Sequence, residues 1–448
     1  MSTGIDRRDF LKTAATAGIG LGLGAELTAC SAVSTQPYVG FAAPPIETVR
    51  VGFVGVGHQG SSHVRNFMRI PGVEIAAVCD LLEDHVEAIQ QGLVAEGRPR
   101  AKAYFGSHED YIRMCEEEDL DLVFTATPWD YHHPVLKKAM ETGKHAASEI
   151  PMALTLEQCW DLVETAERTR RHCIAMENCC YDRAELMILN MVRKGLFGDL
   201  LHAECGYLHD LRELKLSDFY VERWRIKHAE RRNADLYPTH GLGPVTQWLD
   251  INRGNQADFL VAMASPSRGL NLYAAAKFGP ESVEAQKRYA LGDVVNTLIQ
   301  TKRGETILIT HDTDSPRPYS RKILLQGTRG LVRKYPEEKI YIEGINQPHT
   351  WDDLAAWYEQ WEHPLWKTML ERSAGAGHGG MDYIEDYRLV ECLRQGEPTD
   401  MDVYDGAMWA AVIELSERSI ARRSRSVDFP DFTRGAWQGR APLGIIEG

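Results

Sequence analysis

A glycine-rich turn directly after a short apolar run is the feature that most constrains the fold of this chain. Residues 51–60 read VGFVGVGHQG, and Gly55, Gly57 and Gly60 have the spacing G-x-G-x-x-G. Between a strand and a helix, this spacing lets the backbone approach the pyrophosphate of a dinucleotide. A glycine-rich turn without a ligand is the alternative, and the strand–helix series that follows argues against it.

Strand-like and helix-like segments alternate from this turn to about residue 178. The alternation predicts βαβ units and an α/β fold, in which residues 48–178 form an NAD-binding Rossmann domain on a doubly wound parallel sheet. The strand-like segments are residues 49–55, 73–79, 101–105, 120–126, 144–148 and 173–177.

The choice of cofactor is indicated by Asp80, which ends the second strand-like segment. A carboxylate there accepts hydrogen bonds from both ribose hydroxyls of NAD and repels the extra phosphate of NADP. Capping of the following helix is the alternative role for Asp80. Polar residues also follow three other predicted strands, at 127–132, 149–151 and 177–178. Because ligands bind at the carboxyl edge of such sheets, these pieces together predict the NAD cleft.

The second half of the chain, residues 179–448, has a different pattern. After an expected helix at 183–194, strand-like segments recur with few helices between them, and helical patterns return at 351–372, 382–395 and 403–422. This pattern predicts a substrate-binding α+β domain with an open, mostly antiparallel sheet and C-terminal helices. The free face of such a sheet favours a homo-oligomer. The strand-like segments are residues 199–208, 257–264, 293–301, 305–311, 321–327 and 339–343.

Residues 1–30 have the features of an export signal. Arg7 and Arg8 precede a short, glycine-rich apolar run, which indicates the twin-arginine (Tat) export machinery. The run ends in Leu27-Thr28-Ala29-Cys30, which resembles a bacterial lipobox with Cys30 as the lipidated residue. A plain signal with a chance cysteine is the alternative. Residues 31–47 are expected to be a tether, and the protein to be periplasmic or in the cell envelope, with a lipid anchor at Cys30.

Charge and cysteine spacing exclude several classes of protein. The formal net charge is −14, which disfavours nucleic acid as a partner because phosphates need a basic surface. The eight cysteines after Cys30 form no C-x-x-C pair and no small disulfide framework, so buried thiols are expected. The adjacent histidines at 132 and 133 do not have the spacing of facing metal ligands, and no metal is expected.

These motifs resemble the Gfo/Idh/MocA oxidoreductase family from about residue 48 to the end. That family usually reads Glu-Lys-Pro after the fifth strand, with the lysine near the reacting hydroxyl. This chain reads Glu149-Ile150-Pro151 instead. The absence of the lysine argues against ordinary lysine-assisted dehydrogenation.

Four motifs of the second half resemble glycoside hydrolase family 109, the NAD-dependent N-acetylgalactosaminidases. They are GYLHDLRE at 206–213, RWRIKH at 223–228, LYPTHGLGPV at 236–245 and HDTDSPRPYSRKILLQGTRG at 311–330. Where such proteins usually have Leu-Arg in the glycine loop, this chain has His58-Gln59.

The resemblance implies two sets of ligand contacts. The NAD contacts would be His58, Gln59, Asp80, Trp129, Asp130, Tyr131, His132, Glu149, Ile150 and Asn178. The sugar contacts would be Tyr207, Arg225, Tyr237, Pro238, Thr239, His240 and Tyr319. The residue types agree, since aromatic faces pack on sugar rings while Arg and Tyr tips bind hydroxyls.

The expected activity is hydrolysis of terminal, α-linked N-acetylgalactosamine from glycoconjugates, through an NAD-dependent cycle without net redox. His240 is the predicted base at the sugar C3 hydroxyl and Tyr237 the leading candidate at C2, because NAD-dependent glycosidases do not use the usual carboxylate pair. A structural histidine is the alternative reading of His240. Two other functions stay open from the sequence: an exported sugar or polyol oxidoreductase with tightly bound NAD(P), and a sugar-binding lipoprotein without catalysis.

Overall fold

The fold is taken from a computed structural model that describes residues 38–446. The predicted export signal, Cys30 and the tether up to residue 37 lie outside the described residues. In residues 38–446, no helix combines the length and apolar character needed to cross a bilayer.

A six-stranded parallel sheet forms the first half of the fold. Its order, β3-β2-β1-β4-β5-β6, is that of a Rossmann domain, and it confirms the predicted doubly wound sheet. The order reverses between β1 and β4, which is where ligands bind in such folds. The strands are β1 Val49–Val54, β2 Val73–Asp80, β3 Lys102–Phe105, β4 Leu122–Thr125, β5 His145–Ser148 and β6 Cys173–Ala175.

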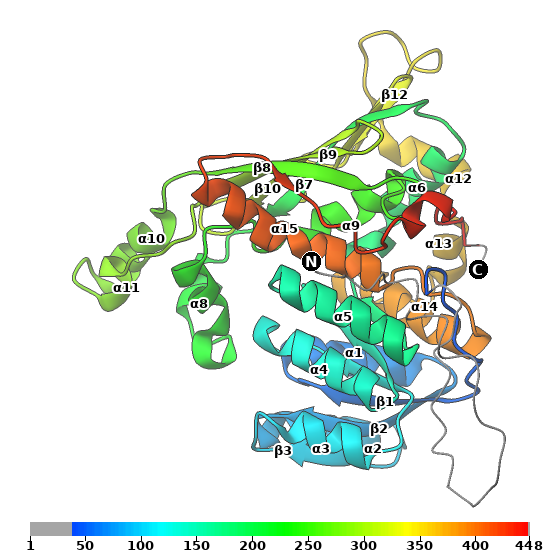
Figure 1. The fold of residues 1–448 in the computed structure, drawn as a ribbon, viewed down its shortest axis with the longest axis vertical. Helices are drawn as coiled ribbons and strands as arrows, with labels where there is room; N and C mark the ends of the chain where they lie inside the picture. The colour runs from blue at the N-terminus through cyan, green and yellow to red at the C-terminus, as the bar shows by residue number, and fades with distance from the viewer. Residues whose placement is uncertain (1–37, 447–448) are drawn as a thin grey trace, which may run out of the picture. The chain divides into compact units, whose positions relative to one another are not determined.

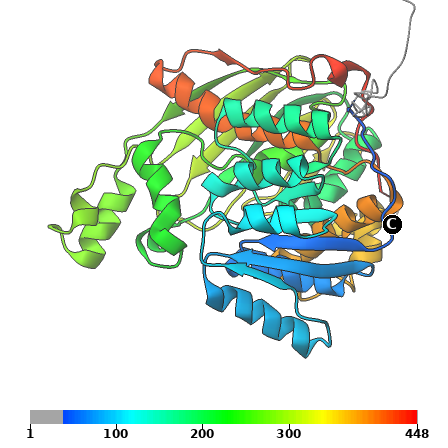
Figure 2. The same cartoon turned by 60° about the horizontal axis from the view of Figure 1, so that its bottom comes forward.

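Helices cover both faces of this sheet (Figure 2). On one side, α5 packs on α4, and α15 (Val403–Ala421) packs on α5 (Figure 1). The start of α5 follows from its sequence, since the Thr155 side chain accepts a hydrogen bond from the Gln158 amide. The helices are α1 His58–Arg69, α2 Glu83–Ala95, α3 Asp110–Glu117, α4 Trp129–Glu141 and α5 Leu156–Thr169.

The second sheet has nine strands in the order β14-β13-β12-β11-β7-β10-β9-β8-β15. Only the pair of β7 and β10 is parallel among the strand pairs of the described residues in this sheet, which confirms the mostly antiparallel prediction. The strands are β7 Leu200–Leu208, β8 Ala257–Ala264, β9 Val295–Thr301, β10 Thr306–Asp312, β11 Leu324–Gly327, β12 Gly330–Arg333, β13 Lys339–Ile342, β14 Asp352–Asp353 and β15 Val427–Asp428.

The predicted helix at 351–372 is wrong. The segment contains the short strand β14, a 3-10 turn and two short helices, α12 (Tyr358–Trp361) and α13 (Pro364–Met369). Pro364 disfavours a helical backbone at His363, which is extended here and caps α13 by accepting a hydrogen bond from the Leu365 amide. The helical pattern at 351–372 therefore corresponds to several short elements rather than to one helix.

Several helices of the second half lack a clear apolar period and were not predicted. The most important is α9 (Thr239–Trp248), whose sequence contains Gly241, Gly243 and Pro244. A Cβ at Gly241 would lie 2.3 Å from the Gly206 amide nitrogen, so glycine is needed for α9 to pack on β7. The other helices without a predicted counterpart are α7 Arg212–Leu216, α8 Trp224–Arg231, α10 Gly269–Phe278 and α11 Val283–Gln286, whereas α6 (Arg183–Arg193) agrees with the helix expected at 183–194.

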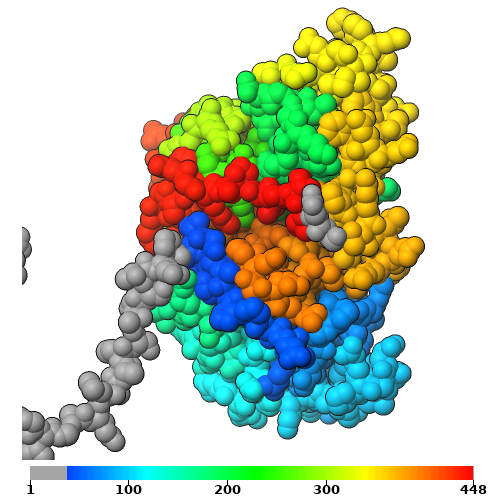
Figure 3. Space-filling model, turned by 90° about the vertical axis from the view of Figure 1, so that its right-hand side faces the viewer, coloured from blue at the N-terminus to red at the C-terminus, as the bar shows by residue number. Residues whose placement is uncertain are grey.

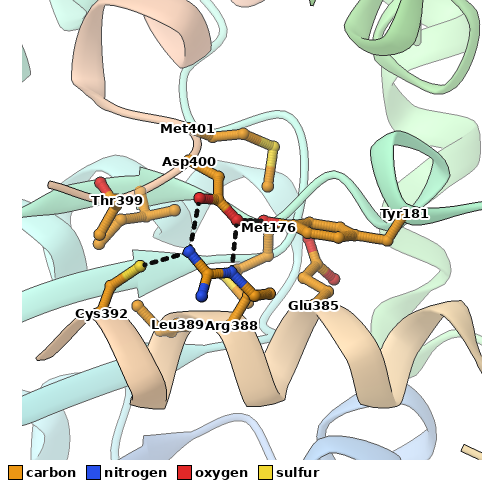
Figure 4. Close-up of a pocket in the computed structure, with 10 residues that line it drawn as sticks. Met176, Tyr181, Glu385, Arg388, Leu389, Cys392, Thr399, Asp400 and Met401 are labelled. Carbon is orange, nitrogen blue, oxygen red and sulfur yellow. Dashed lines mark hydrogen bonds and ion pairs between the residues drawn. The ribbon is translucent and has the colours of Figure 1, made fainter. Parts of the chain in front are cut away.

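The C-terminal helices return to the first half of the fold. Helix α14 (Met381–Gln395) packs on α1, and Figure 3 shows it (orange) beside the N-terminal segment (blue). A buried ion pair fixes the loop between α14 and α15: Arg388 donates to both oxygens of Asp400 at 2.9 Å (Figure 4). Tyr181 donates a third hydrogen bond to Asp400. This network fixes α14 to the loop that precedes α15 and to the 3-10 turn that contains Tyr181.

Candidate active site

A cavity of about 1050 Å³ opens at the carboxyl edge of the first sheet. The glycine turn, Asp80 and Glu149 line it from the first half of the chain, and Tyr207 and His240 line it from the second. Its volume is at the upper end of the range of small-molecule sites, which suits a large cofactor together with a second ligand.

The glycine turn has the backbone geometry that a bound phosphate requires. Gly55 has a φ of +78°, and a Cβ there would lie 2.9 Å from the Ala126 carbonyl oxygen. A Cβ at Gly60 would lie 1.9 Å from the Gly55 carbonyl oxygen. Gly57 precedes α1 and makes no side-chain cap, so the first amides of the helix, from His58 onward, can bind an anion.

Asp80 is held rigidly beside this turn. One carboxylate oxygen accepts a hydrogen bond from the Val56 amide at 2.8 Å, and the other accepts one from the Leu82 amide at 2.9 Å. The His85 ring nitrogen lies 3.1 Å from the second oxygen. The carboxylate lines the cavity at the end of β2, so it is placed for ribose hydroxyls and also supports the turn.

A buried histidine connects the cofactor side of the cavity to α14. His63 lies 2.9 Å from Glu149 Oε1 and 2.8 Å from Asp386 Oδ1. Burial alone would lower the His63 pKa, but the two carboxylates outweigh it and raise the pKa well above its usual range. Burial would likewise raise the Glu149 pKa, but the His63 hydrogen bond prevails and lowers it. His63 is therefore a cation that keeps Glu149 ionised at the cavity wall.

The side of the cavity that is predicted to bind the sugar contains a cation surrounded by aromatic rings. The Arg225 guanidinium carbon lies 5.0 Å from the Trp129 ring centroid, 5.1 Å from Tyr237, 5.6 Å from Tyr220 and 6.0 Å from Tyr207. These distances are within the range of cation–π attraction. Trp129 and Tyr237 also stack, with ring centroids 5.5 Å apart. Residues 5 to 108 positions apart in the chain thus form one wall suited to a polar ring.

His240 forms an acid–base pair with a fully buried carboxylate. Its Nδ1 lies 2.8 Å from Glu177 Oε1, which also accepts a hydrogen bond from the Cys179 amide at 3.0 Å. The imidazole lines the cavity, while the Glu177 side chain is completely shielded from solvent. A carboxylate at Nδ1 fixes the tautomer and leaves Nε2 free to accept a proton, an arrangement that general-base histidines share.

Tyr237 lies between the cofactor wall and His240. Its ring centroid is 4.9 Å from that of His240 and 4.6 Å from that of Tyr207. Burial raises the pKa of Tyr237 well above its usual range, and the Glu149 charge adds to the effect. The hydroxyl is therefore protonated in the free protein.

Comparison with known proteins agrees with this arrangement. Residues 181–439 match the family described as glycosyl hydrolase 109, C-terminal domain, and residues 49–177 match the oxidoreductase family with an NAD-binding Rossmann fold. A Glycosyl hydrolase family 109 protein of Shewanella pealeana is 47% identical over 453 residues, with 99% of each chain covered. The chain belongs to glycoside hydrolase family 109.

Another relative carries an activity in its name. The Alpha-N-acetylgalactosaminidase of Shewanella oneidensis is 46% identical over 455 residues, with 99% of each chain covered. Membership of family 109 supports a glycoside hydrolase, and the Rossmann domain supports NAD as its cofactor.

Solved structures with the same fold are more distant in sequence. An NAD binding oxidoreductase from Klebsiella pneumoniae superposes with a TM-score of 0.68 at 17% identity, covering 86% of this chain and 99% of that one. An inositol dehydrogenase homolog complexed with NAD+ from Azotobacter vinelandii gives 0.64 at 18% identity, covering 87% and 99%. These likenesses confirm the Gfo/Idh/MocA fold of this family 109 chain.

The structure brings most of the predicted NAD contacts to the cavity wall of this family 109 protein. His132 is buried with its ring nitrogens 2.8 Å from the carbonyl oxygens of Pro151 and Thr127, so it fixes the loop geometry. Asn178 donates a hydrogen bond to Asp382 of α14 at 2.7 Å. The predicted NAD contacts that line the cavity are His58, Gln59, Asp80, Trp129, Asp130, Tyr131, His132, Glu149, Ile150 and Asn178.

Three predicted sugar contacts are not among the residues that line the cavity: Pro238, Thr239 and Tyr319. Tyr319 instead places its ring edge-on to His209, with centroids 5.1 Å apart. Seven further lining residues are not among the predicted contacts, although His209 and Trp224 lie within two of the quoted motifs: His85, His108, His209, Phe219, Tyr220, Trp224 and His378.

Three residues bring potential metal-ligand atoms within 4.8 Å of one another, namely Glu177, Cys179 and His240. The Glu177 and His240 atoms are already paired, and burial raises the pKa of the Cys179 thiol well above its usual range. A neutral thiol is a poor metal ligand, so this cluster is better described as a hydrogen-bonded acid–base site.

Removing the charge of Asp80 tests the cofactor side. We expect Asp80→Asn to weaken NADH binding about 10-fold, because hydrogen bonds to a charged group contribute about 1.5–3 kcal/mol. The same change removes the repulsion of the 2′-phosphate, so NADPH binding should improve relative to NADH. Fluorescence titration of nucleotide-stripped protein with both cofactors measures the two dissociation constants. An unchanged ratio of these constants would show that Asp80 only supports the turn.

Proposed function

We propose that this protein hydrolyses terminal, α-linked N-acetylgalactosamine from glycoconjugates by oxidation, elimination, addition and reduction, with no net redox. The observation that carries the proposal is that the Glu177-paired His240 and the Arg225 aromatic wall share one cavity with the glycine turn and Asp80. The name of the Shewanella oneidensis relative supports the choice of sugar.

The cofactor side fits NAD. The glycine turn and the first amides of α1 would hold the pyrophosphate, and Asp80 would bind the ribose hydroxyls. The cavity wall that includes Trp129 and Glu149 would contact the rest of the NAD molecule. When bound, NAD supplies reversible hydride transfer at the sugar C3 carbon. NAD that is restored in each turnover need not leave the protein, which suits an exported enzyme.

The protein side chains move the protons of the cycle. His240 Nε2 removes the proton of the C3 hydroxyl as that carbon is oxidised, and Glu177 stabilises the imidazolium. A C3 ketone acidifies the hydrogen at C2, and a second base removes it. The rings of Tyr237 and Tyr207 both lie beside the His240 ring, and these two tyrosines are the candidates for this step. The C1 substituent then leaves, water adds at C1, and the proton transfers run in reverse.

The sugar oxidoreductase alternative is not favoured. Family membership supports a glycosidase, and the position of the family lysine is occupied by Ile150, which is buried and lines the cavity. An aliphatic side chain cannot supply the proton transfer that the lysine performs in ordinary dehydrogenation.

Turnover in deuterated water tests the proposed function. We expect deuterium at C2 of the released sugar and none at C3, because the C2 proton is removed and the C3 hydride returns. Incorporation below one atom is acceptable if the base returns its own proton. Mass spectrometry and proton NMR of the product measure both positions. Direct displacement at C1 leaves C2 untouched, so normal turnover with an unlabelled C2 would refute the mechanism.

We also propose export by the Tat route with lipidation at Cys30, supported by Arg7 and Arg8 in RRDFLK and by the LTAC sequence. Replacing both arginines with lysine keeps the charge but removes the guanidinium pair, so folded, active protein should accumulate in the cytoplasm. Fractionation with immunoblotting measures this. Undiminished export would exclude the Tat route. Cys30→Ala should separately release the exported protein from the membrane fraction.

A further inference from the structure

A second hydrogen-bonded acid–base pair lies beside His240. The Tyr207 hydroxyl oxygen is 3.0 Å from His209 Nδ1, and both residues line the cavity. Tyr207 is near the end of β7 and His209 follows that strand two positions later, so both side chains point to the same side. The two rings meet edge to face, with centroids 5.7 Å apart.

The position of Tyr207 places this pair next to the first one. Its ring centroid is 5.3 Å from that of His240 and 4.6 Å from that of Tyr237. Tyr207 is almost fully buried, whereas His209 is half-buried at the cavity wall. Two adjacent carbons of one sugar ring, C3 and C2, therefore have two adjacent proton acceptors available, one for each.

The two candidate tyrosines differ in what their hydroxyls contact. Tyr207 has His209 as a hydrogen-bond partner. Among the residues that the structure describes, none forms a hydrogen bond with the Tyr237 hydroxyl, and Glu149 is a nearby negative charge. A hydroxyl can take up a proton from carbon only if its own proton has an acceptor, which Tyr207 has and Tyr237 lacks.

We propose that Tyr207 and His209 remove and return the C2 proton, with Tyr207 as the catalytic residue and His209 as the residue that positions and relays through it. This rests on the proposed function. As the C2–H bond breaks, its proton moves to the Tyr207 oxygen and the phenolic proton moves to His209 Nδ1. The electron pair of the C2–H bond forms the C1=C2 double bond. The C1–O bond breaks at the same time, and the oxygen of the leaving group keeps the electron pair of that bond. The ketone at C3 comes from oxidation by NAD.

The electrostatics of the pair favour a coupled transfer. Burial raises the pKa of Tyr207, partly offset by Arg225, so a free phenolate does not form readily. Burial lowers the pKa of His209, and the positive charge of Arg225 adds to the effect. A neutral imidazole beside a protonated phenol is the arrangement in which both protons move together. His209 reaches the cavity and can exchange its proton with solvent.

A substrate already oxidised at C3 isolates this step from hydride transfer. With nitrophenyl 3-keto-N-acetylgalactosaminide in deuterated water, the wild-type holoenzyme should release nitrophenol faster than the uncatalysed reaction and place deuterium at C2. Tyr207→Phe and His209→Asn should each slow this release about 10²-fold or more, the usual worth of general acid–base assistance. Asparagine keeps a hydrogen-bonding group near Tyr207 but cannot accept the proton. At saturating unoxidised substrate, each change should slow the first-turnover formation of NADH much less than it slows release from the 3-keto substrate.

Two controls separate the possible results. His202→Asn changes a histidine of β7 that is not among the residues lining the cavity. Its Nδ1 lies 2.8 Å from the Thr306 hydroxyl, and the change should leave the release rate unchanged. If Tyr237→Phe abolishes release while Tyr207→Phe does not, Tyr237 is the C2 base and our proposal is overturned. Normal release by His209→Asn would equally overturn the role of His209. A wild-type enzyme that does not accelerate release at all would refute the proposed function itself, and this proposal with it.

Discussion

Replacing His240 with alanine is expected to slow oxidation of the sugar by about 10²–10⁴-fold, the usual contribution of a general base. The effect follows from the geometry, since His240 lines the cavity and its Nδ1 is held by Glu177 at 2.8 Å. Single-turnover formation of NADH, followed by absorbance after mixing holoenzyme with substrate, measures the step directly.

Glu177→Gln tests whether the pairing matters or only the imidazole. An amide nitrogen can donate to Nδ1 and so place the ring proton on Nε2, the tautomer that cannot act as a base. We therefore expect a loss of about 10²-fold or more in the same assay, with nucleotide content unchanged. The matched control for His240→Ala is His133→Ala, which removes a histidine of α4 that is paired with Asp161 of α5. If the His240→Ala protein oxidises the sugar at the normal rate, His240 has a structural role and is not the base.

The first half of the fold could be predicted closely because local pattern and tertiary role agree there. Most strands of the first sheet, such as β1 and β4, are short, buried apolar runs, and β2 ends at Asp80, which lines the cavity. Helix α9 shows the opposite case. Its glycines lower helix propensity, yet they are the residues that let it pack against β7 and place His240. Propensity and packing conflict there, and packing decides.

The sequence predicts individual residues of the site, but it does not predict pairs of residues that meet only through tertiary packing. Glu177 was expected at the cleft, but its pairing with His240 depends on α9 packing against the 3-10 turn at Asn178–Tyr181. His63 and Asp386 are 323 positions apart and meet only because α14 returns to pack on α1. No local pattern in the sequence contains such a contact.

A substitution in the glycine turn should also have a large effect on stability and on NAD binding, because the turn leaves no space for a side chain at Gly60. A Cβ there would lie 1.9 Å from the Gly55 carbonyl oxygen, a backbone atom that cannot move without changing the turn. We expect Gly60→Ala to destabilise the fold by about 1–3 kcal/mol, as overpacking does, and to reduce the nucleotide that copurifies with the protein. Denaturant unfolding and nucleotide content per chain measure the two effects.

Gly92→Ala is the matched control for Gly60→Ala. Gly92 lies in α2, nothing lies within 4 Å of a Cβ built there, and its φ is not positive. Alanine at such a position should stabilise the protein by about 0.4–1 kcal/mol. The decisive quantity is the rise in melting temperature on adding NAD, because a ligand stabilises only the state that binds it. That rise should persist in the Gly92 variant and shrink in the Gly60 variant. If both variants show the full rise, the turn does not hold the pyrophosphate, and the cofactor lies elsewhere in the cavity.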